Sequence, residues 1–488
     1  MKRILPVYRF ALLILMLRFL YAGNASASHT MGADLTYQCI GGNQYKITLS
    51  FYRDCIGIAA PANPFITISS ASCGQNMGVT CYPRPGTGQE VTPTCSSAVT
   101  TCSGGSFTGI QEWIYDGIVT LPMQCTDWRF GYSLCCRNAA ITTINTPSTS
   151  TFYIYATLNN TISPCNTSPT FSNKPVPFLC LGQQFCFNHG AYDADGDSLA
   201  YSLITPLQTA TTPVTYKSPY NAANPLNSSP ATTFNTATGD ICLTPQALEV
   251  TVMAVLVKEY RHGVLIGSVE RDIQMTVMNC NNNLPSLSGI NGTNSYIMTV
   301  CANTPACFYI NSIDPDSGQT LTVNWNNGIP GATFTVDTGS RPVSHFCWTP
   351  SSSDIGHSYT FTATVKDDAC PYRGSQTFSY TINVVGIQVD AGPDQAIACS
   401  DLATLTATAS GGGPYTYQWS NGSTMPSITV GAGTYIVTAS NGICSATDTV
   451  VVTMPYIPIA AFTNSTAGCA NTAISFTDQS TSPGGTIW

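Results

Sequence analysis

Two stretches in the middle of the chain repeat the same arrangement of cysteine, aromatic and acidic residues. The first reads CLGQQFCF at residues 180–187 and DAD at 193–195, and the second reads CANTPACF at 301–308 and DPD at 314–316. Each copy later reaches a related motif, CLTP at 242–245 and CWTP at 347–350. Landmarks that recur in one order over about 100 residues indicate a repeated structural unit. The chain is therefore expected to contain two copies of one small domain.

Short segments of alternating residues occur along the whole chain. Residues 45–51 (YKITLSF) and 151–156 (TFYIYA) alternate with the period of two that is typical of a half-buried strand. Only 9% of the residues are charged while 43% are hydrophobic, so Thr, Ser, Asn and Gly take the place of charge on the surface. Branched side chains such as Thr suit a pleated sheet. The sequence predicts an all-β fold of tandem immunoglobulin-like or cadherin-like β-sandwiches, stapled by disulfides.

The cysteines and the N-terminus indicate export from the cytoplasm. The chain has 21 cysteines without the paired CxxC spacing of a zinc site, and such usage is typical of an oxidising compartment. Basic residues at positions 2, 3 and 9 precede a short apolar run, and ASA at residues 25–27 forms a cleavage motif. This pattern predicts a secretory signal peptide. No later segment is long and apolar enough for a membrane span, so we expect a secreted or extracellular protein, attached to the cell surface.

Six segments follow from these patterns. They are a signal peptide at 1–27, a Cys-rich N-terminal β domain at 28–170, repeat 1 at 171–283, repeat 2 at 284–386, a further β-sandwich at 387–454, and the start of a truncated domain at 455–488. A remainder of some 30 residues is too short to close a sandwich.

Some disulfides are predicted from the distribution of cysteines. Cys399 and Cys444 are the only cysteines of the segment 387–454, so they are expected to pair. In the repeats we expect equivalent pairs, and the cysteines available are Cys180, Cys186, Cys242 and Cys280 in repeat 1 and Cys301, Cys307, Cys347 and Cys370 in repeat 2. Cys469 is left over and is expected to pair with a cysteine beyond residue 488.

Several segments resemble known families. Residues 460–481 resemble the opening of a PKD domain, and residues 414–450 resemble the repeats of gliding-motility surface adhesins. DADGDSLAYSL at 193–203, and FCWTP at 346–350 with YTFTATVKD at 359–367, are similar to cadherin-like or Ig-like modules. The order of segments resembles large surface proteins of Bacteroidota exported by the type IX system. This resemblance implies a non-enzymatic adhesion or scaffold protein whose partners are cell-surface or extracellular polymers, glycans or proteins.

Two acidic loops are candidate calcium sites. Asp193, Asp195 and Asp197 stand at alternate positions on a Gly-bent loop, and Ca²⁺ takes six to eight oxygen ligands. The equivalent loop keeps Asp314 and Asp316, to which Asp367 and Asp368 could add ligands. The resemblance to cadherin-like modules implies calcium at such loops. The alternative is a solvated Asp-Gly turn without a metal.

The charge and the motifs of the chain argue against nucleic-acid binding and against catalysis. The net charge of −8 and the lack of a basic run argue against nucleic acid. No HExxH, G-x-S-x-G or phosphate-loop motif occurs, so we expect no enzyme in this chain. Two alternatives stay open: the chain is the non-catalytic front of a larger secreted hydrolase, or its N-terminal domain binds carbohydrate. We expect the tryptophans to be core residues, and the charges at 258–261 and 270–272 to pair across adjacent strands.

Overall fold

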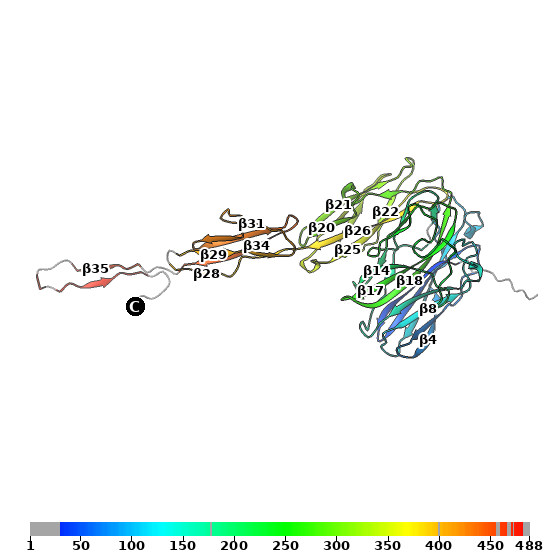
Figure 1. Ribbon diagram of the computed structural model, residues 1–488, viewed down its shortest axis with the longest axis horizontal. Coiled ribbons are helices and arrows are strands. Elements are labelled where there is room, and N and C mark those ends of the chain that lie inside the picture. The colour runs from blue at the N-terminus through cyan, green and yellow to red at the C-terminus, as the bar shows by residue number, and fades with distance from the viewer. Residues whose placement is uncertain are drawn as a thin grey trace, which may run out of the picture. The chain divides into compact units, whose positions relative to one another are not determined.

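The computed structural model describes residues 30–175, 178–398, 401–454, 459–465, 470–471 and 473–481. Figure 1 labels some of the strands along the chain. The described residues belong to two compact units. Unit 1 takes those of Met1–Tyr296, Phe308–Phe346 and Thr360–Tyr380, and unit 2 takes those of Ile297–Cys307, Cys347–Tyr359 and Thr381–Trp488. The predicted signal peptide lies outside the described residues.

Strands make up almost all of the regular structure, which confirms the predicted all-β class. The helices are single 3-10 turns at Thr101–Ser103, Pro147–Thr149, Ile290–Gly292 and Ser352–Asp354. No helix in the described part of the chain is long and apolar enough to cross a membrane. The strand β2 (Gln44–Asp54) shows the expected alternation, because Tyr45, Ile47 and Leu49 are buried and the residues between them are half-buried.

A 13-stranded sheet forms the largest element of unit 1. Its path is β4 (Gln75–Thr80), β3 (Phe65–Ser70), β8 (Trp128–Leu134), β9 (Phe152–Leu158), β18 (Val264–Met278), β1 (Thr30–Gly41), β2, β7 (Ile110–Thr120) and β5 (Tyr82–Pro83). Off this path, β6 (Gln89–Glu90) pairs with β7, β11 (Phe178–Cys180) and β17 (Val250–Arg261) pair with β18, and β14 (Ser198–Ile204) pairs with β17.

β18 connects strands from both sides of the boundary predicted near residue 170. It pairs with β1 through Gly32↔Ile273 and with β9 through Gly267↔Leu158. From Val264 to Thr276 it also pairs with β17 of repeat 1. The Cys-rich N-terminal segment and repeat 1 therefore share one hydrogen-bonded sheet, which differs from the expected string of separate sandwiches.

The main core of unit 1 lies on one face of this sheet. It collects fully buried side chains from strands far apart in sequence, including Leu35, Ile47, Ile68, Tyr115, Phe130 and Ile154. Trp128 is part of this core, and Trp348 and Trp419 are also buried in their own segments. For these three tryptophans, the expectation of core residues is confirmed.

The remaining strands of residues 170–385 form four smaller sheets. These are β10 (Thr170–Phe171) with β13 (Ala191–Tyr192); β12 (Phe185–Phe187), β16 (Ile241–Leu243) and β15 (Thr233–Phe234); β19 (Ser286–Leu287), β21 (Ala306–Ile313), β24 (Val343–Trp348) and β23 (Thr333–Val336); and β20 (Ile297–Cys301), β26 (Ser375–Val385), β25 (Ser358–Lys366) and β22 (Thr322–Trp325).

The internal repeat is visible in the strand pairing. In repeat 1, β11 ends at Cys180 and runs parallel to the end of β18; in repeat 2, β20 ends at Cys301 and runs parallel to the end of β26. In both copies a disulfide then joins the next pair of neighbouring strands. Equal cysteine spacings in the two copies thus correspond to equivalent strands.

Residues 387–454 form short sheets around Trp419. The strands are β27 (Gln388–Asp390) with β30 (Thr408–Ser410); β28 (Gln395–Ala396), β34 (Ser445–Thr453), β33 (Gly433–Ser440) and β31 (Thr416–Trp419); and β29 (Ala403–Thr406) with β32 (Ser427–Val430). The core of this segment contains Leu405, Trp419, Val437 and Val450. Further on, β35 (Phe462–Asn464) pairs with β36 (Phe476–Asp478); most of the predicted PKD start lies outside the described residues.

Nine disulfides staple the described chain. The pairs are Cys39–Cys165, Cys55–Cys102, Cys73–Cys125, Cys95–Cys370, Cys135–Cys136, Cys180–Cys280, Cys186–Cys242, Cys301–Cys444 and Cys307–Cys347. Cys81 is buried with a free thiol. Cys399 and Cys469 lie outside the described residues.

The predicted Cys399–Cys444 pair is wrong, because Cys444 bonds to Cys301. The parallel register of β20 places Cys301 opposite Val385, and the Cys444 sulfur also contacts the Val385 carbonyl. Val385 ends the last strand of repeat 2, so the two cysteines meet where the chain leaves that repeat.

Equivalent pairing holds for one pair of disulfides only. Cys186–Cys242 and Cys307–Cys347 correspond, but Cys180–Cys280 has no counterpart. The corresponding cysteines of repeat 2 bond outside that repeat, Cys301 to Cys444 and Cys370 to Cys95.

Candidate cation site

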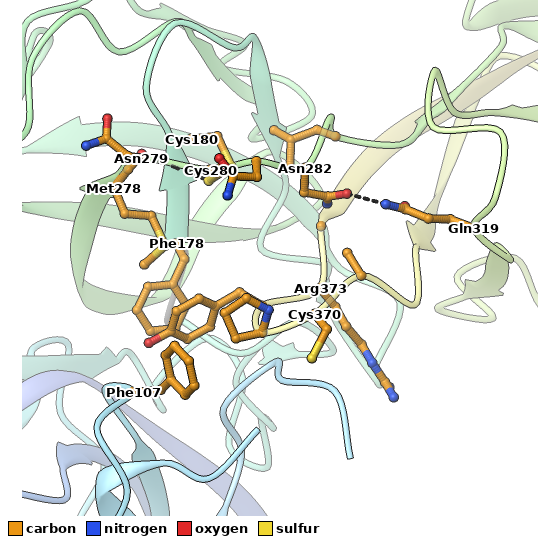
Figure 2. A pocket seen from close by; sticks show the side chains of 16 residues that line it. Phe107, Phe178, Cys180, Met278, Asn279, Cys280, Asn282, Gln319, Cys370 and Arg373 are labelled. Carbon is orange, nitrogen blue, oxygen red and sulfur yellow. Dashed lines mark hydrogen bonds between the residues drawn. A yellow bond between two sulfur atoms is a disulfide. The ribbon is translucent and has the colours of Figure 1, made fainter. Parts of the chain in front are cut away.

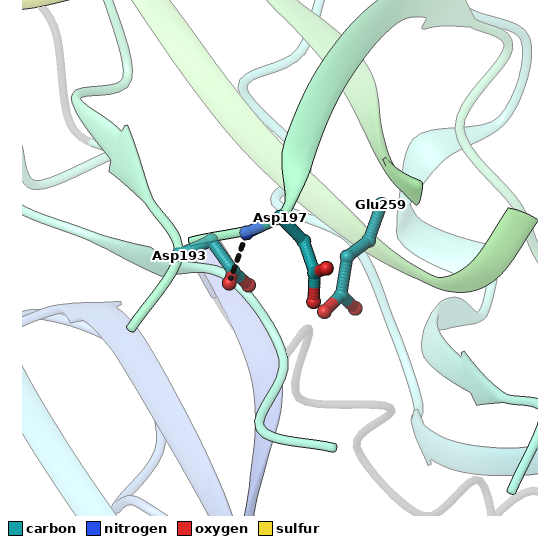
Figure 3. Close-up of side chains that lie close together, drawn as sticks. All are labelled: Asp193, Asp197 and Glu259. Atoms are coloured by element: carbon teal, nitrogen blue, oxygen red, sulfur yellow. Dashed lines mark hydrogen bonds between the residues drawn. The ribbon is translucent and has the colours of Figure 1, made fainter. Parts of the chain in front are cut away.

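The first acidic loop lies between two strands of repeat 1. Asp193 follows β13 and Asp197 precedes β14, so the loop is held at both ends. Antiparallel pairing sets Leu199 of β14 opposite Glu259 of β17. This register brings Glu259, which lies some 60 residues further along the sequence, to the two aspartates (Figure 3).

The loop folds around the carboxylate of Asp193. Its Oδ1 accepts hydrogen bonds from the backbone N–H groups of Asp195 at 2.9 Å and Asp197 at 3.0 Å. Gly196 supplies the left-handed conformation, with φ +82°, that closes such a turn. The second oxygen of Asp193, Oδ2, is buried and has no hydrogen-bond partner among the described residues.

Glu259 completes the cluster from β17. Its side chain is fully buried, and Oε2 accepts a hydrogen bond of 2.8 Å from the Asn166 amide. Oε1 has no partner in the described part of the chain. One carboxylate oxygen each from Asp193, Asp197 and Glu259 lie within 4.8 Å of one another, and no other group of three or more potential metal ligands is this close among the described residues.

Arg261 borders the cluster and neutralises part of its charge. Its guanidinium donates to both oxygens of Asp197, at 2.8 and 2.5 Å, and to the Ser163 hydroxyl at 2.6 Å. Asp195 is not part of the cluster; its carboxylate accepts from the Thr167 N–H at 2.8 Å and lies 3.4 Å from Arg261. Of the three aspartates predicted as ligands, Asp193 and Asp197 come together and Asp195 does not.

Burial changes the protonation of this cluster. Removal from water raises the pKa of the Glu259 carboxyl, and the nearby Asp193 raises it further. Burial likewise raises the pKa of Asp193. Three carboxylates beside one guanidinium leave an excess of negative charge, which a proton or a cation can compensate.

The donor set is compatible with a hard cation, but it is incomplete. Ca²⁺ prefers carboxylate and carbonyl oxygens and takes six to eight of them. The unpartnered oxygens of Asp193 and Glu259 are free to bind, whereas Asp197 is already engaged by Arg261. Bound calcium would be held by Asp193 and Glu259, with Asp197 shared with Arg261 and water or backbone oxygens completing the shell.

The second loop has the same turn without the same cluster. The Asp314 carboxylate accepts from the Asp316 N–H at 2.8 Å, and Asp314 Oδ2 is buried without a described partner. Asp316 accepts two hydrogen bonds from Asn283, both at 2.8 Å. Asp367 and Asp368, the two expected additional ligands, accept backbone hydrogen bonds of their own. The structure therefore does not gather three acids at this loop.

The charges at 258–261 and 270–272 do not pair with one another across β17 and β18 as expected, and Glu270 has no hydrogen-bond partner among the described residues. Arg271 lies 3.1 Å from Asp34 of β1, and Asp272 lies 2.6 Å from Arg137. Glu259 belongs to the acidic cluster described above. The sequence analysis missed Glu259 as a ligand, because only the observed register of β14 on β17 brings it to the loop.

Comparison with known proteins gives only distant likenesses. No family model matches the chain, and no curated protein matches it. The I67–I69 fragment of titin is 14% identical and covers 59% of this chain and 98% of its own, with a TM-score of 0.23. The N-terminal eight Ig domains of DSCAM are 11% identical (87% and 49% coverage, TM-score 0.25), and Drosophila N-cadherin EC1-4 is 15% identical (81% and 93%, TM-score 0.22). TM-scores of this size do not establish a common fold, so the all-β class rests on the strands described above.

Proposed function

We propose that this chain is a secreted, non-enzymatic adhesion or scaffold protein of the cell surface. The observation that carries the proposal is the all-β framework with nine disulfides among the described residues, two of which join different predicted segments. Disulfides persist in oxidising, extracytoplasmic environments and restrict unfolding. The resemblance of residues 414–450 to gliding-motility adhesin repeats supports the surface role and suggests export by a type IX system.

The test measures both where the protein lies in the cell and whether it adheres to extracellular material. Antibodies against the chain should label intact cells of the source organism, and beads coated with the oxidised protein should bind cell-surface or extracellular material more than beads coated with the reduced, alkylated protein. Cytoplasmic protein, or equal binding by both bead types, would contradict the proposal. Hydrolysis of polymers by the purified chain would contradict its non-enzymatic part.

We further propose that the cluster of Asp193, Asp197 and Glu259 binds calcium, which would stiffen repeat 1. Two unpartnered, buried carboxylate oxygens support this proposal. Because its pKa is raised, the Glu259 carboxyl keeps its proton to a higher pH than an exposed glutamate does. Calcium would replace this proton, so calcium binding should release protons, and the affinity for calcium should increase as the pH rises.

Thermal melts with calcium and with EDTA test the site. A ligand at a hundredfold excess over its Kd stabilises the folded state by about 2.7 kcal/mol, so millimolar calcium should raise the midpoint by several degrees. Glu259→Gln should remove most of this shift. Asp337→Asn, which alters an exposed acid paired with His345, should keep it. Equal midpoints in calcium and EDTA would refute the proposal.

A further inference from the structure

Three adjoining hollows in unit 1 share lining residues. The first, of about 420 Å³, shares Phe178 and Arg373 with the second, of about 210 Å³. The second shares Asn173 and Lys366, among others, with the third, of about 170 Å³. All lining residues belong to unit 1, and we call this feature the polar groove.

One wall of the polar groove is the hydrophilic face of a sheet in repeat 2. β22 pairs with β25 so that Asn324 lies opposite Thr364, while Val323 lies opposite Val365. Because side chains alternate across a strand, Asn324, Thr364 and Lys366 share one face and the valines face the other way. The face thus presents amide, hydroxyl and ammonium groups to the groove.

The other wall comes from the N-terminal segment and repeat 1, and covalent and hydrogen bonds fix it. The Asn173 amide donates to the Asn188 carbonyl at 2.7 Å. The Cys95–Cys370 disulfide and the hydrogen bond from the Arg373 N–H to the Pro93 carbonyl, at 2.8 Å, attach the 370–373 loop to the N-terminal segment. A groove held in this way loses little conformational entropy when it binds a ligand.

The lining of the polar groove is cationic, although the whole chain is acidic. Lys174, Lys366 and Arg373 line the second hollow, and no described lining residue of the three hollows is Asp or Glu. Lys174 is paired with Glu112 at 2.6 Å. Lys366 and Arg373 are exposed and form no ion pair with a described residue. Two uncompensated cations in a chain of net charge −8 favour an anionic ligand.

Aromatic rings give the first hollow an apolar floor. Figure 2 shows Phe107 and Phe178 on one side of this hollow and Asn282 with Gln319 on the other. The ring of Tyr372 packs against both phenylalanines, with centroid distances of 5.9 and 5.0 Å. Near the opposite side, Asp316 accepts a hydrogen bond from Gln319, and Asp367 accepts one from Asn282. These two carboxylates would repel the anionic groups of a ligand, so we place those groups in the second and third hollows.

We propose that the polar groove binds an anionic oligosaccharide. The carboxylate or sulfate groups of the sugar pair with Lys366 and Arg373, its hydroxyl groups bond to amides and hydroxyls such as those of Asn324 and Thr364, and its C–H faces lie against the aromatic floor. Short amide and hydroxyl side chains match the closely spaced hydroxyls of a sugar. The assignment rests on the proposed adhesion role, to which it adds a class of ligand.

The test measures binding by titration calorimetry with the full oxidised chain. The probes are hexagalacturonate for carboxylates, a sulfated hexasaccharide for sulfates, neutral maltohexaose, and polyglutamate for an acidic peptide. We expect one or both anionic sugars to bind, with affinity falling as salt rises, because exposed charges are screened. Comparison of the affinities for hexagalacturonate and for the sulfated hexasaccharide shows whether the groove prefers carboxylates or sulfates.

Charge-removing variants locate the site. Lys366→Gln and Arg373→Gln should each weaken binding about tenfold, the change that corresponds to one lost charged contact. Lys217→Gln should leave binding unchanged, since Lys217 is also exposed but lies outside the groove. All three changes are at exposed side chains, so the melting temperature should stay the same.

Several results would overturn the groove assignment. These are no binding of either anionic sugar, equal binding of maltohexaose or polyglutamate, or full binding by the Lys366→Gln/Arg373→Gln variant. The bead assay separates this failure from failure of the adhesion role. If beads still adhere while no sugar binds, the groove assignment is wrong and adhesion stands; if sugars bind while beads do not adhere, the adhesion role is wrong.

Discussion

At the scale of single residues, β18 carries charges that are almost completely removed from solvent. Arg137 donates to both oxygens of Asp272, at 3.1 and 2.6 Å, and each side chain is at most 2% exposed. Burial raises the pKa of the Asp272 carboxyl, and Arg137 offsets part of this effect. Such a pair adds little net stability compared with apolar residues, yet removal of one partner leaves a buried charge uncompensated.

Arg137→Met should therefore lower the free energy of unfolding by about 3–5 kcal/mol. Denaturant titration measures the change. The control is Arg84→Met, which removes an exposed partner of Asp116 and should cost less than about 1 kcal/mol. Equal effects of the two substitutions would show that burial does not determine the contribution of Arg137.

We expect the stability of the folded chain to depend on pH through the buried His189 of repeat 1. The ring is fully buried, its nitrogens have no hydrogen-bond partner among the described residues, and the Arg271 guanidinium lies beside its carbonyl. Burial lowers the pKa of His189 well below its ordinary value, and Arg271 lowers it further. The unfolded chain then binds a proton near pH 6.5 that the folded chain does not, so folding loses stability as the pH falls.

Between pH 7.5 and pH 5.0, this one group should remove about 2 kcal/mol from the free energy of unfolding. His189→Phe keeps a ring against Phe171 and Phe187 but cannot titrate, so its stability should decline less over the same interval. Denaturant titrations at the two pH values measure the difference. Parallel declines for the two proteins would refute the role of His189.

At the scale of elements, β18 decides how the chain divides into domains. It supplies partners to β1 and β9 of the N-terminal segment as well as to β17 and β11 of repeat 1. Its Arg271 and Asp272 also pair with Asp34 and Arg137 of the N-terminal segment. Without β18, two strand edges and two buried charges of that segment lose their partners, and exposed edges favour aggregation.

A fragment of residues 30–170 should therefore fail to fold cooperatively. A fragment of residues 30–283, with Cys95→Ser to remove the thiol that normally bonds to Cys370, should unfold in one cooperative transition. Circular dichroism melts and dye binding compare the two fragments. A cooperative melt for residues 30–170 would show that β18 is not required.

At the scale of the whole molecule, the local sequence pattern predicted individual strands, whereas contacts between residues far apart in the sequence were not predicted. Alternation in residues 45–51 predicted β2, since side-chain direction depends only on neighbouring residues. The equal cysteine spacings predicted equivalent strands in the repeats. The partner of Cys444 was missed, because a segment with only two cysteines does not reveal a third one, Cys301, more than 140 residues earlier in the chain.

The acidic cluster of the candidate cation site was likewise predicted only in part. The sequence identified Asp193 and Asp197, because their loop spacing is local. It missed Glu259, which only the register of β14 on β17 brings to them, and it included Asp195, whose carboxylate binds Thr167 and Arg261 instead.

The amino-acid sequence alone determined the all-β class and the acidic turns, since each depends on residues within a few positions of one another, and it determined the repeat, since two stretches carry the same short motifs in the same order. Only the tertiary structure decided that β18 joins two predicted domains, that Glu259 completes the acidic cluster, and that Lys366 and Arg373 line one groove. Those outcomes depend on which strands pair over separations of up to some 240 residues, and the free energy of such pairing comes from burial and hydrogen bonding across the whole fold.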